Sequence, residues 1–194
     1  RPMQRNDIRE VAIVRLYAND SVAARNTADA LGTFRHPNAI AALSYAAGRT
    51  DLSAEARAAA VKALGIIGSA PGEAAIVGAL ADSDAAVRVE ALDAYLALRD
   101  NRDGSPLVGL LGDGEVIVRR RATAVLGSYR LPAARATFES LLASDPDFLV
   151  RRNAAWALGK LGDRASRPAL EAARDHDASR VVSSVAAAAI RGLR

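Results

Sequence analysis

Four arginines recur at equivalent positions and are the side chains best suited to binding an anion. Their separations are 31, 31 and 32 residues, and they are Arg57, Arg88, Arg119 and Arg151. A guanidinium group binds phosphate or carboxylate through two parallel hydrogen bonds, so such a row could hold a nucleic acid or an acidic protein. The arginines could instead pair, within or between repeats, with loop aspartates such as Asp84 or Asp147. We favour this structural role and call the four residues the arginine ladder.

Acidic loops and two histidines are the other residues with chemical potential. Loops such as Asp82-Ser83-Asp84 could suggest calcium, but an oxygen directly before a helix normally caps its free amide groups. His36 and His176 lie in expected surface turns, and the chain has no cysteine. The sequence contains neither a Gly-x-Ser-x-Gly motif nor a phosphate-binding Gly-x-x-x-x-Gly-Lys-Ser/Thr motif. We therefore expect a non-enzymatic protein with no catalytic residue, no metal and no cofactor.

The charge balance is basic but modest for a chain of 194 residues. The formal net charge is +4. The isoelectric point is nevertheless near 9.9, because every basic residue except Lys62 and Lys160 is arginine, which keeps its proton at high pH. With 51% hydrophobic residues, the chain is too apolar to be disordered. The sequence shows no apolar run long enough to span a membrane and no signal peptide. We expect a cytoplasmic protein, although the start Arg1-Pro2-Met3 suggests that an upstream piece is missing.

A repeat of about 32 residues runs along the whole chain. We take as anchor the large residue before each repeated glycine position. The gaps between anchors are 33, 31, 31, 32 and 32 residues, and the anchors are Leu31, Leu64, Tyr95, Leu126, Leu158 and Ile190. Around Leu158, the apolar residues Val150, Ala154 and Ala157 have the spacing of one buried helical face. A Gly-containing turn follows each first helix, and a proline such as Pro132 then opens a second helix.

These units predict an all-α fold, a right-handed α-solenoid of five to six helical hairpins that forms a single domain over residues 1–194. One hairpin cannot bury its apolar face alone, whereas stacked neighbours share a continuous core. Half repeats at 1–17 and 177–194 leave the array incomplete at both ends. We expect either a segment of a longer protein or ends covered by self-association or by another chain. Complete repeats are expected at about 20–48, 51–81, 82–111, 113–143 and 145–174.

The repeat resembles the HEAT repeat family, specifically the short HEAT-like repeats of the phycobilin lyase type. The resemblance covers essentially the whole chain and rests on the Asp-x-Asp loop and on Val150-Arg151, Ala154-Ala155, Leu158-Gly159 and their equivalents. It implies an armadillo-like stack in which second helices line a concave surface and repeated arginines pair with aspartates. Deoxyhypusine hydroxylase is a HEAT-repeat enzyme that holds iron through His-Glu pairs. This sequence has no His-Glu dipeptide.

The outward positions of the expected second helices are small and uncharged, with Tyr45 as the exception. At 100° per residue these positions point away from the buried stripe. A groove for a nucleic-acid backbone would carry Arg or Lys there, so the pattern argues against nucleic acid. A floor of small residues either lets a partner helix or extended chain approach closely, or is simply tolerated by a shallow repeat.

The only tryptophan, Trp156, occupies a first-helix position that normally faces solvent, where another repeat carries Lys62. Arg152 lies one turn before it and Lys160 one turn after it, and Arg120 is the equivalent of Arg152 in the preceding repeat. Arg152 could stack on the indole as a cation–π pair. An exposed tryptophan beside cations is typical of an interaction hot spot. Shielding of the core at a repeat junction would explain the tryptophan equally well.

These features favour a non-enzymatic scaffold or adaptor that binds another protein on its curved surface. The candidate contact residues are Tyr45, Arg120, Arg152, Trp156 and Lys160. One alternative, implied by the resemblance, is a subunit similar to the phycobilin lyases, which act on a tetrapyrrole and its acceptor protein. The other is a HEAT-like nucleic-acid-binding protein, which the isoelectric point favours and the uncharged second-helix positions oppose.

Overall fold

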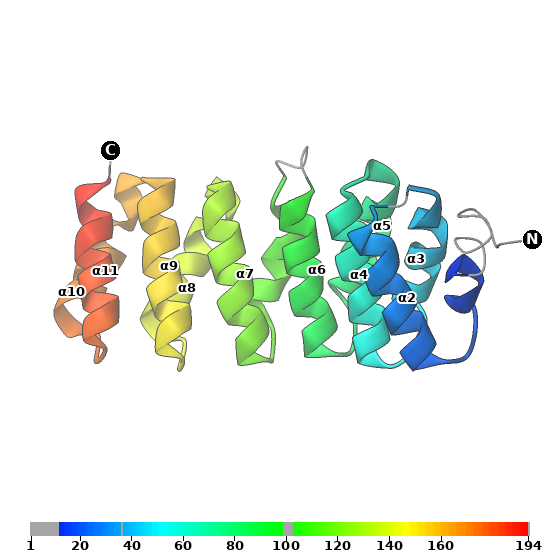
Figure 1. Ribbon diagram of the computed structural model, residues 1–194. Coiled ribbons are helices and arrows are strands. Elements are labelled where there is room, and N and C mark those ends of the chain that lie inside the picture. Colours follow the sequence, from blue (N-terminus) through cyan, green and yellow to red (C-terminus); the bar gives the residue numbers. More distant parts are fainter. Residues whose placement is uncertain (1–11, 36, 99–102, 194) are drawn as a thin grey trace, which may run out of the picture. The chain divides into compact units, whose positions relative to one another are not determined.

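The protein is built from helices, and Figure 1 shows the computed structural model. The structure describes residues 12–35, 37–98 and 103–193, and within these ranges it contains no strand. The chain divides into two compact units, residues 1–101 and 102–194, which are each described by themselves. Each unit stacks helical hairpins, so the expected all-α solenoid is confirmed. The single domain over residues 1–194 stays a prediction.

The first unit has a layer of first helices and a layer of second helices. The first-helix layer is α2 (Ser21–Thr33), α4 (Ala54–Ile67) and α6 (Ala85–Ala97). The second layer consists of the short 3-10 helix η1 (Pro37–Ala39) leading into α3 (Ile40–Ala47), and of α5 (Ala70–Ala79). Helix α4 packs against α2, α6, α3 and α5, so the core of this unit lies between the two layers.

The second unit repeats this arrangement. Its first-helix layer is α7 (Val116–Tyr129), α9 (Phe148–Leu161) and α11 (Arg180–Arg191), and α9 packs against both neighbours (Figure 1). Its second layer is η2 (Ser105–Gly112), η3 (Pro132–Ala134) with α8 (Arg135–Ser144), and η4 (Arg164–Ser166) with α10 (Arg167–His176). Helix α8 packs on α9, and α10 packs on α11.

The expected half repeat at 1–17 lies mostly outside the described residues. Residues 12–15 are helical and Leu16 is fully buried. His36 also lies outside the described part of the chain, whereas His176 is exposed at the end of α10.

Local sequence signals explain where the helices begin. The side chains of Asp20 and Asp147 each accept two backbone N–H groups at the start of α2 and α9, which satisfies donors that have no partner within the helix. Proline stands in the first turn of the second-layer helices α5, η2 and α10, where its missing N–H costs nothing. Pro132 also begins η3, as the repeat pattern predicts.

The core contains five of the six anchors, all but Ile190, and the apolar stripe that the sequence predicts. In α9, Val150, Ala154, Ala157 and Leu158 are all at most 1% exposed. Each second helix contributes at least one fully buried large side chain, and the residues at equivalent positions are Leu43, Ile76, Leu107, Phe138 and Leu170. Because each hairpin buries its stripe against its neighbour, burial of these side chains drives the stacking.

Four of the six anchors are followed by a glycine, and each of these glycines lies inside its first helix. Three of them, Gly32, Gly65 and Gly159, face an alanine of the next first helix. A Cβ on Gly65 would lie only 2.7 Å from the Ala94 Cα, and one on Gly159 would lie 2.8 Å from the Ala189 Cβ. Glycine is required at these positions because a larger residue would push the two helices apart.

Four of the turns depend on a residue in the left-handed region, which lies four positions after the anchors Leu31, Leu64, Leu126 and Leu158. Gly68 and Gly162 take this conformation with φ of 66° and 75°, and Arg35 and Arg130 adopt it with φ of 48° and 52°. Left-handed backbone ends a helix and reverses the chain, which glycine does with less strain than arginine.

One second helix differs from the expectation. The segment Ser105–Gly112 forms a 3-10 helix throughout rather than an α-helix. It is short and holds Gly109 and Gly112, and glycine lowers helix stability because its backbone loses the most freedom on folding. Leu107, Leu110 and Leu111 are still buried, so this helix contributes to the core as an α-helix would.

Candidate interaction site

Three arginines of the ladder connect successive repeats. Each donates from Nε and Nη2 to the carboxylate of an aspartate in the next loop. The Nε to Oδ2 distance is 2.8 Å in every case, and the pairs are Arg57–Asp82, Arg119–Asp145 and Arg151–Asp177. The Nη1 atom of each arginine also donates to a carbonyl oxygen of the loop before its own helix. One guanidinium therefore joins two loops.

The aspartates that pair with Arg57, Arg119 and Arg151 lie in the loops that the sequence predicted, but they are not the two aspartates it named as examples. Asp84 and Asp147 do not pair with the ladder but accept backbone N–H groups at the starts of α6 and α9. The hydrogen bonds from Arg151 lower the pKa of Asp177 in spite of its burial. Arg88 donates to the carbonyl oxygens of Asp82 and Ser83, at 2.8 and 3.1 Å.

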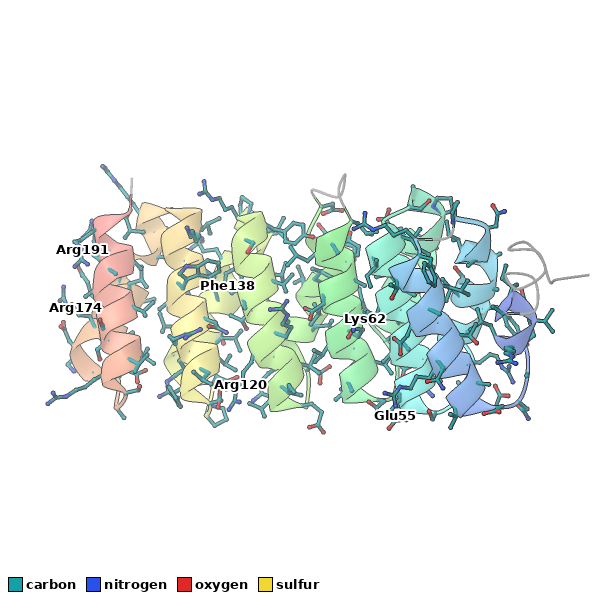
Figure 2. All side chains as sticks on the ribbon, in the orientation of Figure 1. Glu55, Lys62, Arg120, Phe138, Arg174 and Arg191 are labelled. Atoms are coloured by element: carbon teal, nitrogen blue, oxygen red, sulfur yellow. The ribbon has the colours of Figure 1, made fainter. Side chains whose placement is uncertain are left out.

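The Arg120 side chain is held by the loop that begins α9. Its Nε donates to Asp147 Oδ1 at 2.8 Å, and its Nη2 forms a second bond to the same carboxylate. These bonds from Arg120 lower the pKa of Asp147 to about 2. Asn153 adds a further link between α7 and α9, because its Nδ2 donates to the Arg120 carbonyl oxygen at 3.0 Å. The structure therefore places Arg120 in a stabilising network as well as near the surface (Figure 2).

Trp156 lies half-buried on the first-helix layer of the second unit. Its six-membered ring covers Gly127 of α7, and a Cβ on that glycine would lie 2.4 Å from the Trp156 Cζ3. The indole thus fills the junction between two repeats, and 37% of the residue remains exposed. The two roles that the sequence left open, core shielding and surface contact, are compatible in this geometry.

Two shallow grooves lie on either side of Trp156. The groove toward α11 has a volume of about 380 Å³ and is lined by Trp156, Gly159, Lys160, Val185, Ala188, Ala189 and Gly192. The groove toward α7 has a volume of about 420 Å³ and is lined by Ala124, Arg152, Asn153, Trp156 and Val185. We call these two grooves, with Trp156 between them, the tryptophan groove.

The cation over the indole is Lys160 rather than Arg152. The Lys160 Nζ lies 5.6 Å from the centroid of the Trp156 ring, within the range of a cation–π contact. Arg152 instead donates from Nε and Nη2 to the side-chain oxygen of Asn153, at 3.1 and 2.7 Å. Asn153 in turn is fixed by its bond to α7, so the neighbouring asparagine draws Arg152 away from the ring.

Tyr45 belongs to a separate cluster in the first unit. Its ring stacks on Tyr17 with centroids 5.0 Å apart, and both residues are about half exposed. The Arg49 guanidinium lies 5.6 Å from the Tyr45 centroid and also donates to the Ala18 carbonyl oxygen. The sequence reasoning missed Tyr17, because nothing in the repeat pattern shows that a residue before the first complete repeat reaches α3.

The second-helix positions expected to face outward are exposed in both units, and they are Ala41, Tyr45, Ala74, Gly78, Ser105, Gly109, Ala136, Ser140, Pro168 and Ala172. The tryptophan groove, however, lies among the first helices. The sequence did not predict that Gly127 and Val185 belong to this site. Both residues lie on helices next to α9, and the repeat pattern does not show which side chains of neighbouring helices meet.

Within residues 12–35, 37–98 and 103–193, no group of three or more His, Cys, Asp or Glu side chains could hold a metal ion. None of the helices in the same ranges is both long and apolar enough to cross a membrane.

Stacked hairpins that share an apolar core and are joined by arginine–aspartate pairs define an α-helical repeat protein. A family model for HEAT repeats matches residues 10–97 and 104–191. The chain belongs to the HEAT repeat family, which confirms the resemblance seen in the sequence. A comparison with curated protein sequences finds no match.

Several solved structures are similar to this chain at low sequence identity. A designed armadillo repeat protein in complex with the peptide (KR)4 has a TM-score of 0.68 and 20% identity, covering 95% of this chain and 98% of that one. Human deoxyhypusine hydroxylase has a TM-score of 0.53 and 20% identity, covering 96% and 84%. The complex of CpcE and CpcF of phycocyanin lyase from Nostoc sp. PCC7120 has a TM-score of 0.49 and 18% identity, covering 96% and 94%. The first two similarities show that the fold is that of an α-helical repeat protein.

Replacing Arg151 by alanine tests the structural role of the arginine ladder. We expect the free energy of unfolding to fall by about 3 kcal/mol, because the change leaves the Asp177 carboxylate, 6% exposed, without its partner. Arg174→Ala is the control, since it removes an exposed pair with Asp175 and should change stability little. Urea unfolding measures both. Equal, small effects of the two substitutions would show that the ladder does not stabilise the stack.

Asp147→Asn tests the link between Arg120 and α9 through its pH dependence. The pKa of Asp147 in the folded protein is about 2, below its ordinary value of 3.8. Ionised Asp147 therefore stabilises the fold above about pH 4, and this contribution is lost as the pH falls toward 2. Asparagine keeps the helix cap but not the charge. We expect wild type to be more stable than Asp147→Asn at pH 7, with the gap closing between pH 4 and 2.

Asp20→Asn supplies the control for this pH series. Asp20 caps α2 through Oδ1, with 3.0 Å bonds from the N–H groups of Val22 and Ala23, so the same substitution is made at a similar cap. Thermal unfolding is followed at each pH. A wild-type advantage over Asp147→Asn that stays constant down to pH 2 would contradict the account.

Proposed function

We propose that this HEAT repeat protein is a non-enzymatic interaction scaffold that binds a segment of a partner protein in the tryptophan groove. The observation that carries the proposal is the position of Trp156, which stands between two grooves and keeps 37% of its surface exposed. A large aromatic side chain fixed within a depression is the usual centre of a protein-binding hot spot.

The surroundings of Trp156 support binding rather than bond-making chemistry. Val185, Ala188 and Ala189 give the groove an apolar wall, and Arg152 and Lys160 provide charge. This set offers contact area and orientation but no nucleophile beside a general base, which catalysis by side chains would need. The tryptophan is also preorganised, since packing on Gly127 fixes the ring before any partner arrives.

The repeat fold also supports the proposal that the protein binds another protein. Stacked repeats present extended surfaces that proteins use to hold other chains. The similar designed armadillo repeat protein is in complex with a peptide, which is an example of such use in that protein. A cytoplasmic location remains a prediction from the sequence.

Crosslinked capture from a lysate of the source cells, with quantification of the captured proteins, tests this proposal. We expect Trp156→Ala to reduce the amount of the specific partner by about tenfold or more, because hot-spot truncation typically costs 2 kcal/mol or more. Ile117→Ala is the matched control, since Ile117 is an exposed aliphatic residue of α7 that lines neither groove.

A second variant separates loss of binding from loss of folding. Val185 lines both halves of the tryptophan groove, so Val185→Gln should obstruct them while leaving the packing of Trp156 on Gly127 intact. Thermal melts verify that each variant is folded. Capture of the same proteins in the same amounts by both folded groove variants and by wild type would refute the proposed site.

A further inference from the structure

The first-helix layer of the second unit carries only one sign of charge. Helices α7, α9 and α11 contain no Asp or Glu, whereas each contains at least two basic residues. Some of these cations are neutralised within the fold, since Arg119, Arg120 and Arg151 pair with loop aspartates. Two other cations of this layer, Arg152 and Lys160, line the tryptophan groove.

Arg152 and Lys160 are the cations of the groove itself. Both are exposed, and within the described part of the chain neither forms an ion pair. Arg152 donates to a neutral amide oxygen of Asn153, and Lys160 lies over an uncharged ring. Each side chain is thus oriented by a neighbour that leaves its positive charge uncompensated. No acidic residue lines either half of the groove.

The corresponding surface of the first unit has a different charge pattern. A groove of about 460 Å³ lies among α2, α4 and α6, and the charged residues lining it are Arg25, Asp29, Glu55, Lys62, Asp84 and Glu90. Glu55 and Lys62 are labelled in Figure 2. Four carboxylates and two cations line this groove, so acidic side chains are in excess. The apolar residues that line it are all alanines, which offer little surface for an apolar contact. The cationic, apolar character is therefore a property of the tryptophan groove and not of the repeat in general.

We propose that the tryptophan groove recognises an acidic segment of a partner protein that also carries apolar side chains. This inference rests on the proposed function and specifies the chemistry of the partner. Carboxylates of the segment pair with Arg152 and Lys160, and its apolar side chains cover Trp156 and contact Val185 and Ala188. Charge complementarity of this kind steers the encounter and selects against basic partners.

A nucleic acid fits the same surface less well. Binding of single strands relies on bases stacking on open aromatic faces along a track of cations. Trp156 is a single aromatic side chain packed against Gly127, and Lys160 lies over its ring, so the groove offers no row of aromatic faces on which successive bases could stack. The walls around the ring are aliphatic and suit apolar side chains. The observations thus favour a protein segment.

Binding of defined peptides to the full chain tests the inference. The probe is a fluorescein-labelled peptide of repeated Glu-Leu-Leu-Glu units, as long as α11, followed by fluorescence anisotropy. Three matched probes replace Glu by Lys, replace Leu by Ser, or use oligothymidylate of equal length. Trp156 is the only tryptophan, so its intrinsic fluorescence reports independently whether a ligand occupies the groove.

The variant Arg152→Glu/Lys160→Glu tests the two cations directly. We expect it to weaken binding of the acidic probe by about tenfold or more, and rising salt to weaken the wild-type complex. The control, Arg25→Glu/Lys62→Glu, changes the formal net charge equally, because each double reversal removes four charges from +4. It should leave the affinity within about twofold, since its residues line the groove of the other unit.

Several results would overturn the inference. These are no saturable binding of the acidic probe, tighter binding of the lysine probe or of oligothymidylate, and equal losses in the two double reversals. The proposed function fails separately. If partner capture depends on Trp156 and Val185 but not on Arg152 and Lys160, the groove binds a protein whose recognition is apolar, and only the acidic-segment inference is wrong.

Discussion

The structure depends first on how closely successive first helices approach each other. At Gly32, Gly65 and Gly159 a Cβ atom would lie within 2.9 Å of an atom of the alanine that faces it in the next helix. This contact is tighter than side chains normally permit, so it fixes the spacing of repeats within each unit. The spacing in turn lets an arginine such as Arg151 reach the carboxylate of the following loop. Apolar burial drives the stacking, and the glycine contacts and arginine pairs determine its register.

The candidate site arises from one departure within this regular scheme. At the position where other repeats carry small or charged residues, Trp156 covers the glycine of the preceding repeat, Gly127. The ring is too large to be buried there completely, and it divides the adjoining surface into two grooves. Arg152 and Lys160 occupy the turns before and after it on the same helix. A HEAT scaffold can thus acquire a specific surface through a few residues on one helix, without any change of fold.

Periodicity was sufficient to predict the helices, because burial of Val150, Ala154 and Leu158 depends on spacing along one helix. Features that depend on contacts between helices could not be read in this way. The sequence suggested Asp147 as a ladder partner, whereas Asp145 and Asp177 take that role, since partner choice depends on where neighbouring loops lie. The sequence also predicted a glycine in the turn after each first helix, whereas Arg35 and Arg130 take the left-handed position in two of these turns. The cation above Trp156 was misassigned because Asn153 binds Arg152.

The most direct test of the packing constraint is the free energy of unfolding of Gly65→Ala, compared with that of Gly78→Ala. Alanine favours helix over glycine by about 1 kcal/mol, so propensity alone predicts that both substitutions stabilise the protein. A Cβ on Gly78 meets nothing within 4 Å, whereas one on Gly65 would lie 2.7 Å from the Ala94 backbone. We predict that Gly78→Ala raises stability and that Gly65→Ala lowers it by about 1–3 kcal/mol through overpacking. A stabilising effect of Gly65→Ala, equal to that of Gly78→Ala, would contradict the account.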